Sequence, residues 1–192
     1  MREPSFWWRA PGPMAGLLAS LGALYGVIAA RRMAQLGQRA RVPVVCIGNL
    51  TVGGAGKTPT AIAVGRLLQA EGARPMFLTR GYGGRLGGPV AIAPAHGAVD
   101  VGDEPLLLAR IAPTIVARDR AAGARAAEAA GADVIVMDDG FQNPALAKDL
   151  SLIVVDGRRG LGNGKVFPSG PLRAPLQQQI ARAQALLVVG EP

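Results

Sequence analysis

Residues 42–58 read VPVVCIGNLTVGGAGKT, and this stretch decides how the rest of the chain is interpreted. An apolar run from Val42 to Ile47 is followed by a glycine-rich turn, then by Gly-Lys-Thr and a helical pattern. Strand, glycine-rich turn and helix in this order are the layout of a P-loop, in which successive backbone N–H groups converge on phosphate groups. The usual motif has glycine five residues before Gly56, where this chain has Thr51, so the match departs from the general pattern at that position.

We expect this loop to bind the phosphates of a nucleotide, with Lys57 reaching the β- and γ-phosphates and the Thr58 hydroxyl binding Mg²⁺. A glycine-rich turn that binds nothing is the alternative, but it leaves a lysine at a helix N-terminus unexplained. Partition-type and septum-positioning ATPases share GGxGKT but carry a signature lysine before the glycines, where this chain has Val52. The expected nucleotide-binding residues are Thr51, Val52, Gly53, Gly54, Ala55, Gly56, Lys57 and Thr58.

The composition of the 192 residues suits one sizeable core, or one domain with an appendage. Hydrophobic residues make up 49% of the chain and aromatic residues 4%, a balance typical of buried parallel strands that alternate with alanine-rich helices. The single cysteine, Cys46, excludes an internal disulfide and a CxxC metal site, and we expect it to pack in the core.

Apolar strands and helical segments alternate along the chain after the loop. This order predicts an α/β fold of the P-loop NTPase type, with a mostly parallel sheet and helices on both faces. In such sheets ligands bind beyond the carboxyl ends of the strands. After the first strand, we expect strands at 75–78, 90–93 (an edge), 114–117, 134–137, 152–155 and 186–189, and helices at 58–70, 104–110 and 120–130.

Three further motifs occupy positions at this edge of the predicted sheet. The segment 138–142 (DDGFQ) directly follows the four-residue apolar strand 134–137. This is the Walker B arrangement, in which a carboxylate at the strand end holds Mg²⁺ or its water. A solvated acidic turn is the alternative. The segment 102–105 (GDEP) precedes a helix, and its Asp103 is either functional or an N-cap. In the segment 79–83 (TRGYG) the arginine is a candidate to pair with a phosphate and the tyrosine to stack on a sugar, unless the loop has no role.

The first 41 residues differ from the rest in charge. They carry six arginines against Glu3, a net +5 out of the total of +8. The basic charge therefore belongs to this arm and does not form a broad nucleic-acid-binding surface, and no nucleic-acid-binding motif accompanies it. We divide the chain into a basic and apolar arm at 1–41, expected to associate with a membrane, and a P-loop nucleotide-binding domain at 42–192, which is the kinase domain if the resemblance described below holds.

Within the arm, an uncharged apolar run at 14–30 lies between Trp7-Trp8 and Arg31-Arg32. A signal peptide would export the P-loop away from ATP. A transmembrane span, an ordinary packed helix and a helix lying in the membrane interface stay open, and the run is at the lower limit of length for a span. Tryptophans at the headgroup level and arginines attracted to anionic lipid favour the interfacial helix.

Taken together, these segments resemble one family closely, tetraacyldisaccharide 4′-kinase, the lipid A 4′-kinase of Gram-negative bacteria. The resemblance covers essentially the whole chain and depends on GNLTVGGAGKTP, TRGYGG, GDEP, DDGFQ and GNGKVFPSGPLR, in that order. It implies transfer of the ATP γ-phosphate to the 4′-hydroxyl of a tetraacylated glucosamine disaccharide 1-phosphate, a lipid A precursor. It also implies ATP and Mg²⁺ as cofactors and a location at the cytoplasmic face of the bacterial inner membrane.

The resemblance also implies roles for individual residues. Asp103 looks like the general base that accepts the proton of the sugar hydroxyl, with Lys57 as the second catalytic residue. Thr58, together with an acidic group from Asp139 or Glu104, would hold Mg²⁺. The residues expected to face the disaccharide head group are Asn49, Arg80, Tyr82, Arg120, Asp138 and Gln142.

Two departures from the family pattern matter. A histidine often follows DDGFQ in the family, whereas this chain has Asn143, to which we assign no role. Family members continue for roughly another domain, which contributes a histidine that supports the base and a wall of the ATP cleft. The only histidine here, His96, is not assumed to replace it. We therefore expect a fragment or a truncated form that binds ATP but transfers phosphate poorly by itself.

Two alternative functions stay open at this point. One is a soluble P-loop ligase or kinase of the dethiobiotin-synthetase kind, which predicts no membrane-seeking arm and a small polar acceptor. The other is a non-enzymatic, nucleotide-switched membrane adaptor, which predicts dimerisation on ATP; Val52 in place of the signature lysine counts against it. The sequence does not fix the acyl-chain preference or the oligomeric state.

Overall fold

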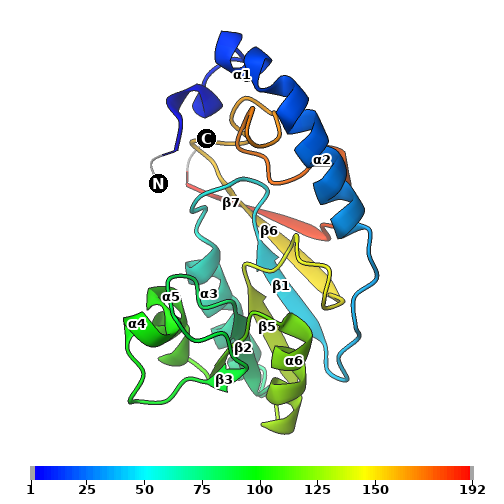
Figure 1. The fold of residues 1–192 in the computed structure, drawn as a ribbon. Helices are drawn as coiled ribbons and strands as arrows, with labels where there is room; N and C mark the ends of the chain where they lie inside the picture. The colour runs from blue at the N-terminus through cyan, green and yellow to red at the C-terminus, as the bar shows by residue number, and fades with distance from the viewer. Residues whose placement is uncertain (1–2, 191–192) are drawn as a thin grey trace.

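The structure is a computed structural model that describes residues 3–190. Met1 and Arg2 of the predicted arm, and Glu191 and Pro192 of the predicted nucleotide-binding domain, lie outside the described residues. Within the described range seven strands form one sheet, in the order β3-β4-β2-β5-β1-β6-β7 (Figure 1). The strands are β1 (Val44–Gly48), β2 (Pro75–Thr79), β3 (Val90–Ala91), β4 (Thr114–Val116), β5 (Val134–Asp138), β6 (Leu150–Asp156) and β7 (Ala185–Val189). All neighbours are parallel except β3 and β4, which confirms the predicted mostly parallel sheet with β3 at an edge.

Helices cover both faces of this sheet. They are the 3₁₀ turn η1 (Ser5–Trp8) and the α-helices α1 (Pro13–Leu17), α2 (Ala19–Met33), α3 (Lys57–Ala70), α4 (Ala98–Val101), α5 (Asp103–Ala109), α6 (Arg120–Ala129) and α7 (Leu176–Ile180). Alternate strand residues point to opposite faces. Val136 on β5 accordingly packs in a cluster with residues of α3 and α5, while its neighbour Met137 packs in a cluster with residues of α6 and the end of α2.

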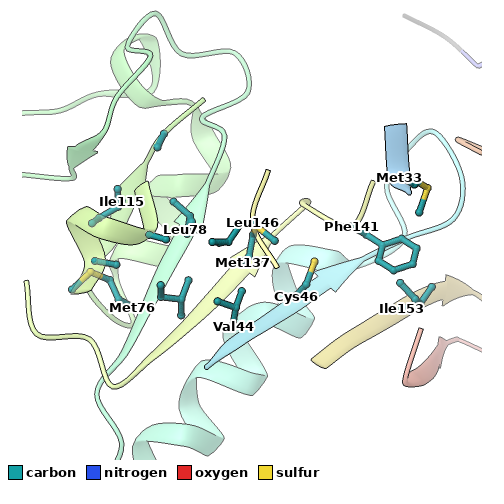
Figure 2. Packing of buried hydrophobic residues seen from close by; sticks show 14 of the residues in the cluster. Met33, Val44, Cys46, Met76, Leu78, Ile115, Met137, Phe141, Leu146 and Ile153 are labelled. Carbon is teal, nitrogen blue, oxygen red and sulfur yellow. The ribbon is translucent and has the colours of Figure 1, made fainter. Parts of the chain in front are cut away.

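The second of these clusters forms the larger part of the core. Figure 2 shows Cys46, Met137, Leu78 and Met33 brought together there from β1, β5, β2 and α2. Cys46 has no exposed surface, which confirms its expected place in the core. A loop at residues 139–149, between β5 and β6, lies on this face and adds Phe141 to the cluster.

The two edges of the sheet are different. At one edge β3 is only two residues long and pairs antiparallel with β4. At the other edge β7 pairs only with β6 among the described residues, and every residue of β7 is exposed. Its Leu186 and Leu187 point to opposite faces and are 57% and 38% exposed, so apolar side chains on both sides of this strand lie uncovered in this structure.

The N-terminal arm packs on the loop 157–175 through one side of its helices. Trp7 is buried and its Nε1 donates a hydrogen bond to the Pro168 carbonyl at 3.0 Å, while Ser169 Oγ donates to the Ala15 carbonyl at 2.7 Å. Gly22 on α2 allows close approach, because a Cβ there would lie 3.0 Å from the Val166 carbonyl oxygen. The arm is thereby fixed to the rest of the fold.

The opposite side of the arm is apolar and exposed. Its large side chains include Leu17, Leu21, Leu24 and Ile28, with exposed fractions between 56% and 75%. The helix α2 has 15 residues, and none of the helices at residues 3–190 has the length and apolar character needed to cross a bilayer. Figure 1 shows α1 and α2 at the periphery of the molecule, separate from the helices that flank β2 and β5.

Candidate nucleotide and magnesium site

The glycine-rich loop connects β1 to α3 as predicted. Two of its glycines adopt left-handed backbone angles that other residues rarely take, with φ of 108° at Gly53 and 84° at Gly56. Gly56 is the N-cap of α3, and its carbonyl accepts hydrogen bonds from the backbone N–H and the hydroxyl of Thr60. The first turn of α3 therefore begins at Lys57 and presents its free N–H groups toward the loop, as an anion-binding turn requires.

Asn49 holds the glycine-rich loop through two side-chain hydrogen bonds. Its side chain is fully buried, and its Nδ2 donates hydrogen bonds to the carbonyls of Thr51 at 2.8 Å and Gly53 at 3.0 Å. Asn49 is predicted from the sequence to face the disaccharide, whereas in this structure its amide points into the loop. The amide instead holds the loop backbone in shape, because the loop turns over the end of β1 and leaves those carbonyls without strand partners.

Gln142 has the same inward orientation, again contrary to expectation. Its Nε2 donates to the Asn49 carbonyl at 2.7 Å and to Gln179 Oε1 at 2.9 Å. Gln179 is fully buried and donates in turn to the carbonyls of Leu50 and Ala174. These amides form a network that ties the end of β1 to the DDGFQ loop and to α7.

Thr58 and Asp138 form the pair at the centre of the site. Thr58 Oγ1 donates a hydrogen bond to Asp138 Oδ2 at 3.0 Å, and Asp138 is fully buried. The Oδ1 atom of Asp138 has no hydrogen-bond partner among the described residues. Burial raises the pKa of this carboxyl to about 6, and the nearby charges of Glu104 and Asp139 act in the same direction, while the Thr58 hydroxyl acts in the opposite one.

This pairing involves a different carboxylate from the two predicted to hold Mg²⁺ with Thr58. The carboxylate expected beside Thr58 was Asp139 or Glu104, and Asp138 was expected at the sugar surface. Asp138 lies at the end of β5 on the same face as Val136, which packs in the α3 cluster, so it points at the first turn of α3. Asp139 follows outside the strand, with a left-handed φ of 52° that breaks the strand alternation.

Asp139 instead faces two cations. Its Oδ1 lies 3.9 Å from Lys57 Nζ and 3.3 Å from a terminal nitrogen of Arg173. Lys57 also donates a long hydrogen bond, 3.4 Å, to the Gly53 carbonyl, and its side chain is only 10% exposed. The lysine is thus folded back over the loop between a carbonyl and a carboxylate.

Arg173 is a site residue that the sequence analysis missed. Its Nε donates to the Thr51 carbonyl at 2.9 Å, and its backbone N–H donates to the Leu50 carbonyl at 2.9 Å. The segment around it pairs with the start of the loop, as Thr51 and Leu172 form an antiparallel bridge. The motif GNGKVFPSGPLR contained this arginine, but a contact across more than 120 residues leaves no signal in local spacing.

Arg120 is the first residue of α6, and its guanidinium lies close to Asp139. It is 2% exposed, and its guanidinium donates to the carbonyls of Ala117 and, at 3.4 Å, of Asp139. Burial lowers the pKa of this guanidinium, and its Nε has no partner among the described residues. The predicted substrate residue is therefore close to the site but covered. By contrast, Arg80 is exposed and Tyr82 is 85% exposed, as a surface role requires.

The GDEP segment reaches the same edge of the sheet. The N-cap of α5 is Gly102 and no side chain caps this helix, so the alternative that Asp103 is the N-cap is wrong. Asp103 and Glu104 begin α5 and are exposed. A Cβ on Gly102 would lie 2.3 Å from the Tyr82 carbonyl oxygen, so the TRGYGG and GDEP loops are in contact.

Residues 3–190 contain no cluster of three or more His, Cys, Asp and Glu side chains that would hold a metal by themselves. Mg²⁺ in phosphate-transfer sites is typically bound by one or two protein oxygens, with substrate phosphates and waters completing the octahedron. The Thr58 hydroxyl and the unpaired Oδ1 of Asp138 fit that requirement. His96 is elsewhere, in a turn where its Nδ1 accepts the Ala93 N–H.

The parallel sheet, the glycine-rich loop with Lys57 and Thr58, and a strand-end aspartate beside that threonine define a P-loop protein of the phosphate-transferring class. A family model described as LpxK, tetraacyldisaccharide-1-P 4′-kinase, matches residues 14–192. The chain belongs to this family.

Curated relatives agree with this assignment. Tetraacyldisaccharide 4′-kinase of Rhodopseudomonas palustris (strain BisB18) is 64% identical over 99% of this chain and 56% of the relative. The protein of the same name from Methylobacterium sp. (strain 4-46) is 65% identical over the whole chain and 58% of the relative. The chain thus spans a little over half the length of these relatives.

A solved structure has the same fold. It is the "apo" form of LpxK from Aquifex aeolicus in complex with ATP, with a TM-score of 0.79 and 28% sequence identity. The match covers 93% of this chain and 63% of that chain. Membership of this family favours the kinase interpretation over the dethiobiotin-synthetase kind and over the adaptor.

Proposed function

We propose that this chain carries the nucleotide and acceptor sites of a lipid kinase. The reaction is transfer of the ATP γ-phosphate to the 4′-hydroxyl of a tetraacyl disaccharide 1-phosphate in lipid A biosynthesis. The observation that carries the proposal is the Thr58–Asp138 pair beneath a Gly-Lys-Thr loop, within a chain of this family. The Aquifex aeolicus relative in complex with ATP supports the choice of nucleotide.

The loop would hold the β- and γ-phosphates with its backbone N–H groups and the first turn of α3. Lys57 would leave the Gly53 carbonyl, to which its hydrogen bond is long at 3.4 Å and therefore weak, and extend to the transferring phosphate. Asp139 and Arg173 then face each other directly at 3.3 Å, so the carboxylate keeps a cation partner when the lysine moves. The arginine also adds positive charge beside the loop, where charge develops during transfer.

Mg²⁺ supplies charge neutralisation at the phosphates when it is bound. In this chain the Thr58 hydroxyl and Asp138 would hold it, and the unpaired, desolvated Oδ1 of Asp138 is the oxygen with a vacant acceptor position. A divalent cation there would return the pKa of Asp138 toward its ordinary range, because it offsets the cost of burying the charge.

Asp103 is proposed as the general base. Its carboxylate is exposed at the start of α5, next to the TRGYGG loop whose Tyr82 and Arg80 are exposed as well. The carboxylate would take the proton of the sugar hydroxyl as that oxygen bonds to the γ-phosphorus. The bond between the γ-phosphorus and the bridging oxygen breaks, and ADP leaves. Arg80 and Tyr82 would orient the sugar head group.

Attachment to an anionic membrane surface, at the cytoplasmic face of the inner membrane, is part of the proposal. The exposed apolar side of α1 and α2 suits a helix that lies in the interface, and Arg31 and Arg32 follow in its last turn. A tetraacylated substrate leaves a bilayer only at high cost, so a kinase that acts on it gains from working at the surface.

The test uses a chimaera, because the chain spans only part of its relatives. Residues 1–192 replace the matching region of the Methylobacterium sp. relative, to which this chain is 65% identical. With radiolabelled ATP and a tetraacyl disaccharide 1-phosphate, the chimaera should form the labelled bisphosphate. Lys57→Ala in the chimaera should abolish that product while leaving the fold intact, with Arg66→Ala on the exposed side of α3 as the control.

Two results would contradict the proposal. One is a folded chimaera that binds ATP but forms no bisphosphate while the intact relative does. The other is near-normal turnover by the Lys57→Ala chimaera, which would remove the P-loop from the chemistry.

A further inference from the structure

A cavity lies on the face of the sheet opposite to α3, away from the glycine-rich loop. Its volume is about 320 Å³, and none of residues 51–58 line it. It is formed where the end of α2, the loop after β5 and the segment after α7 meet. The lining residues that matter for its chemistry are Leu36, Gln142, Lys148, Ser151, Arg182 and Gln184.

The two cations of this cavity have no acidic partner. Lys148 is half-buried, and its Nζ donates one hydrogen bond to the Asn143 carbonyl. Arg182 is half-buried and donates to the Gln178 carbonyl at 3.1 Å. Within residues 3–190 no carboxylate lies in ion-pair distance of either cation; the neighbouring Asp149 pairs with Arg39 at 3.8 Å instead. Both cations therefore keep N–H groups available for an anion.

The surroundings of Lys148 disfavour its charged form. Burial lowers the pKa of the Lys148 ammonium, and the charges of Arg120 and Arg182 lower it further. A bound anion would relieve both effects, since an opposite charge favours the charged form of the lysine. The remaining lining is uncharged and combines apolar side chains such as Phe141 and Leu146 with polar ones. Gln184 Oε1 accepts the Ser151 N–H at 2.8 Å, and amide groups suit the hydroxyls of a glycerol or a sugar.

The mouth of the cavity adjoins the apolar arm. Leu36 lines it and is fully exposed, three residues beyond Met33, the last residue of α2. On α2 itself Leu21, Leu24 and Ile28 are exposed on the side proposed to contact lipid. A head group at the membrane surface would therefore meet the cavity at the end of that helix.

We propose that this cavity binds the phosphate group of an anionic phospholipid head group, separately from the nucleotide and the acceptor. The proposal rests on the membrane attachment proposed above but not on kinase activity. The phosphate would lie between Lys148 and Arg182, with the adjoining glycerol against Gln184 and Ser151. The site would make the chain prefer a membrane that contains anionic phospholipid, and it would fix the rotational orientation of the N-terminal arm on that membrane.

The experiment measures binding of this chain to vesicles of phosphatidylcholine, alone or mixed with phosphatidylglycerol. Lys148→Gln with Arg182→Gln removes both cations, and the new amide at 148 retains a donor for the Asn143 carbonyl. Arg66→Gln with Arg110→Gln, both exposed and on α3 and at the end of α5, gives the same change in charge. We expect the first pair to weaken binding to the mixed vesicles about tenfold or more and the control pair to change it about twofold or less.

A second experiment titrates soluble glycerol 1-phosphate by calorimetry. It distinguishes a lipid head group from a free phosphate as the ligand. Weak binding that the first pair abolishes, together with its loss of vesicle binding, supports the proposal. Binding of the soluble phosphate with no effect of that pair on vesicles overturns the lipid source. If the two pairs of substitutions have equal effects in both experiments, the site is overturned. If the unaltered chain binds no vesicles of either composition, the membrane attachment itself is overturned. Lys148→Arg, which keeps the charge, should retain binding; its loss with unchanged melting temperature would contradict the phosphate role.

Discussion

Replacing Asp138 by Asn should stabilise the fold at neutral pH while it removes the proposed metal oxygen. In the unfolded chain this carboxyl ionises near its ordinary pKa of 3.8, whereas burial raises the pKa to about 6 in the folded protein. Between these values the folded protein binds more protons than the unfolded chain. The free energy of unfolding therefore falls as pH rises through this interval and stays lowered above it.

The size of the effect follows from the shift. About two pKa units correspond to roughly 3 kcal/mol of cost at about pH 8, since each unit is worth about 1.4 kcal/mol. Asparagine avoids that cost and still accepts the Thr58 hydroxyl, but its amide N–H takes the place of an unpaired buried oxygen and costs about 1 kcal/mol or more. We expect Asp138→Asn to be more stable by roughly 1 to 2 kcal/mol at about pH 8 and to have no advantage at about pH 4.

Urea denaturation without Mg²⁺ or nucleotide, at both pH values, measures this difference. Comparing the variant with the unaltered chain cancels the titration of other groups. Asp139→Asn is the control, because that carboxylate is 37% exposed and faces Lys57 and Arg173, so its loss should not stabilise. An Asp138→Asn protein that is less stable than the unaltered chain at about pH 8 would refute the reasoning, as would a stability difference that does not depend on pH.

Two further predictions concern the acceptor and the membrane. Asp103→Asn in the chimaera should lower the transfer rate about 10² to 10⁴-fold with unchanged ATP affinity, as loss of a general base does; a rate within about twofold of the parent would exclude that role. Replacing Leu21, Leu24 and Ile28 together by Ser should release this chain from anionic vesicles without lowering its melting temperature, because these side chains are exposed. Sedimentation with vesicles checks this, and unchanged co-sedimentation would contradict the interfacial helix.

The strands and the main helices were predictable because their signals are local. Short apolar runs such as 134–137, bounded by turn residues, are typical of buried strands, and the glycines around Lys57 permit the turn that β1 and α3 require. The same runs determined which loops reach the carboxyl edge of the sheet. The GDEP and TRGYGG segments are accordingly close to each other, although no motif by itself predicts that contact.

The assignment of the two aspartates required information beyond spacing. Residues 138 and 139 point in different directions because Asp138 ends β5 and Asp139 leaves it with a left-handed backbone. Strand parity places Asp138 on the side of Val136, and the position of α3 on that same side decides which carboxylate meets Thr58. The sequence motif shows that two aspartates follow the strand, but it does not show which face of the sheet α3 covers.

The inward amides and Arg173 were not predictable for a different reason. Asn49, Gln142 and Gln179 satisfy carbonyls that belong to turns, and their partners lie as far as 129 residues away in the chain. A polar residue next to a site looks the same in sequence whether it faces a ligand or the backbone. Only the path of the loop after β6, which returns Arg173 to Thr51, distinguishes the two.

The uncovered strand β7 has a consequence for how this chain behaves in concentrated solution. An edge strand with free N–H and C=O groups and apolar side chains on both sides is a template for pairing with a second chain. The two-residue strand β3 at the other edge offers almost no such template. In a preparation of these 192 residues alone, self-association should therefore begin at β7 rather than at β3, and two copies that pair β7 against β7 leave no further edge of this kind for a third copy.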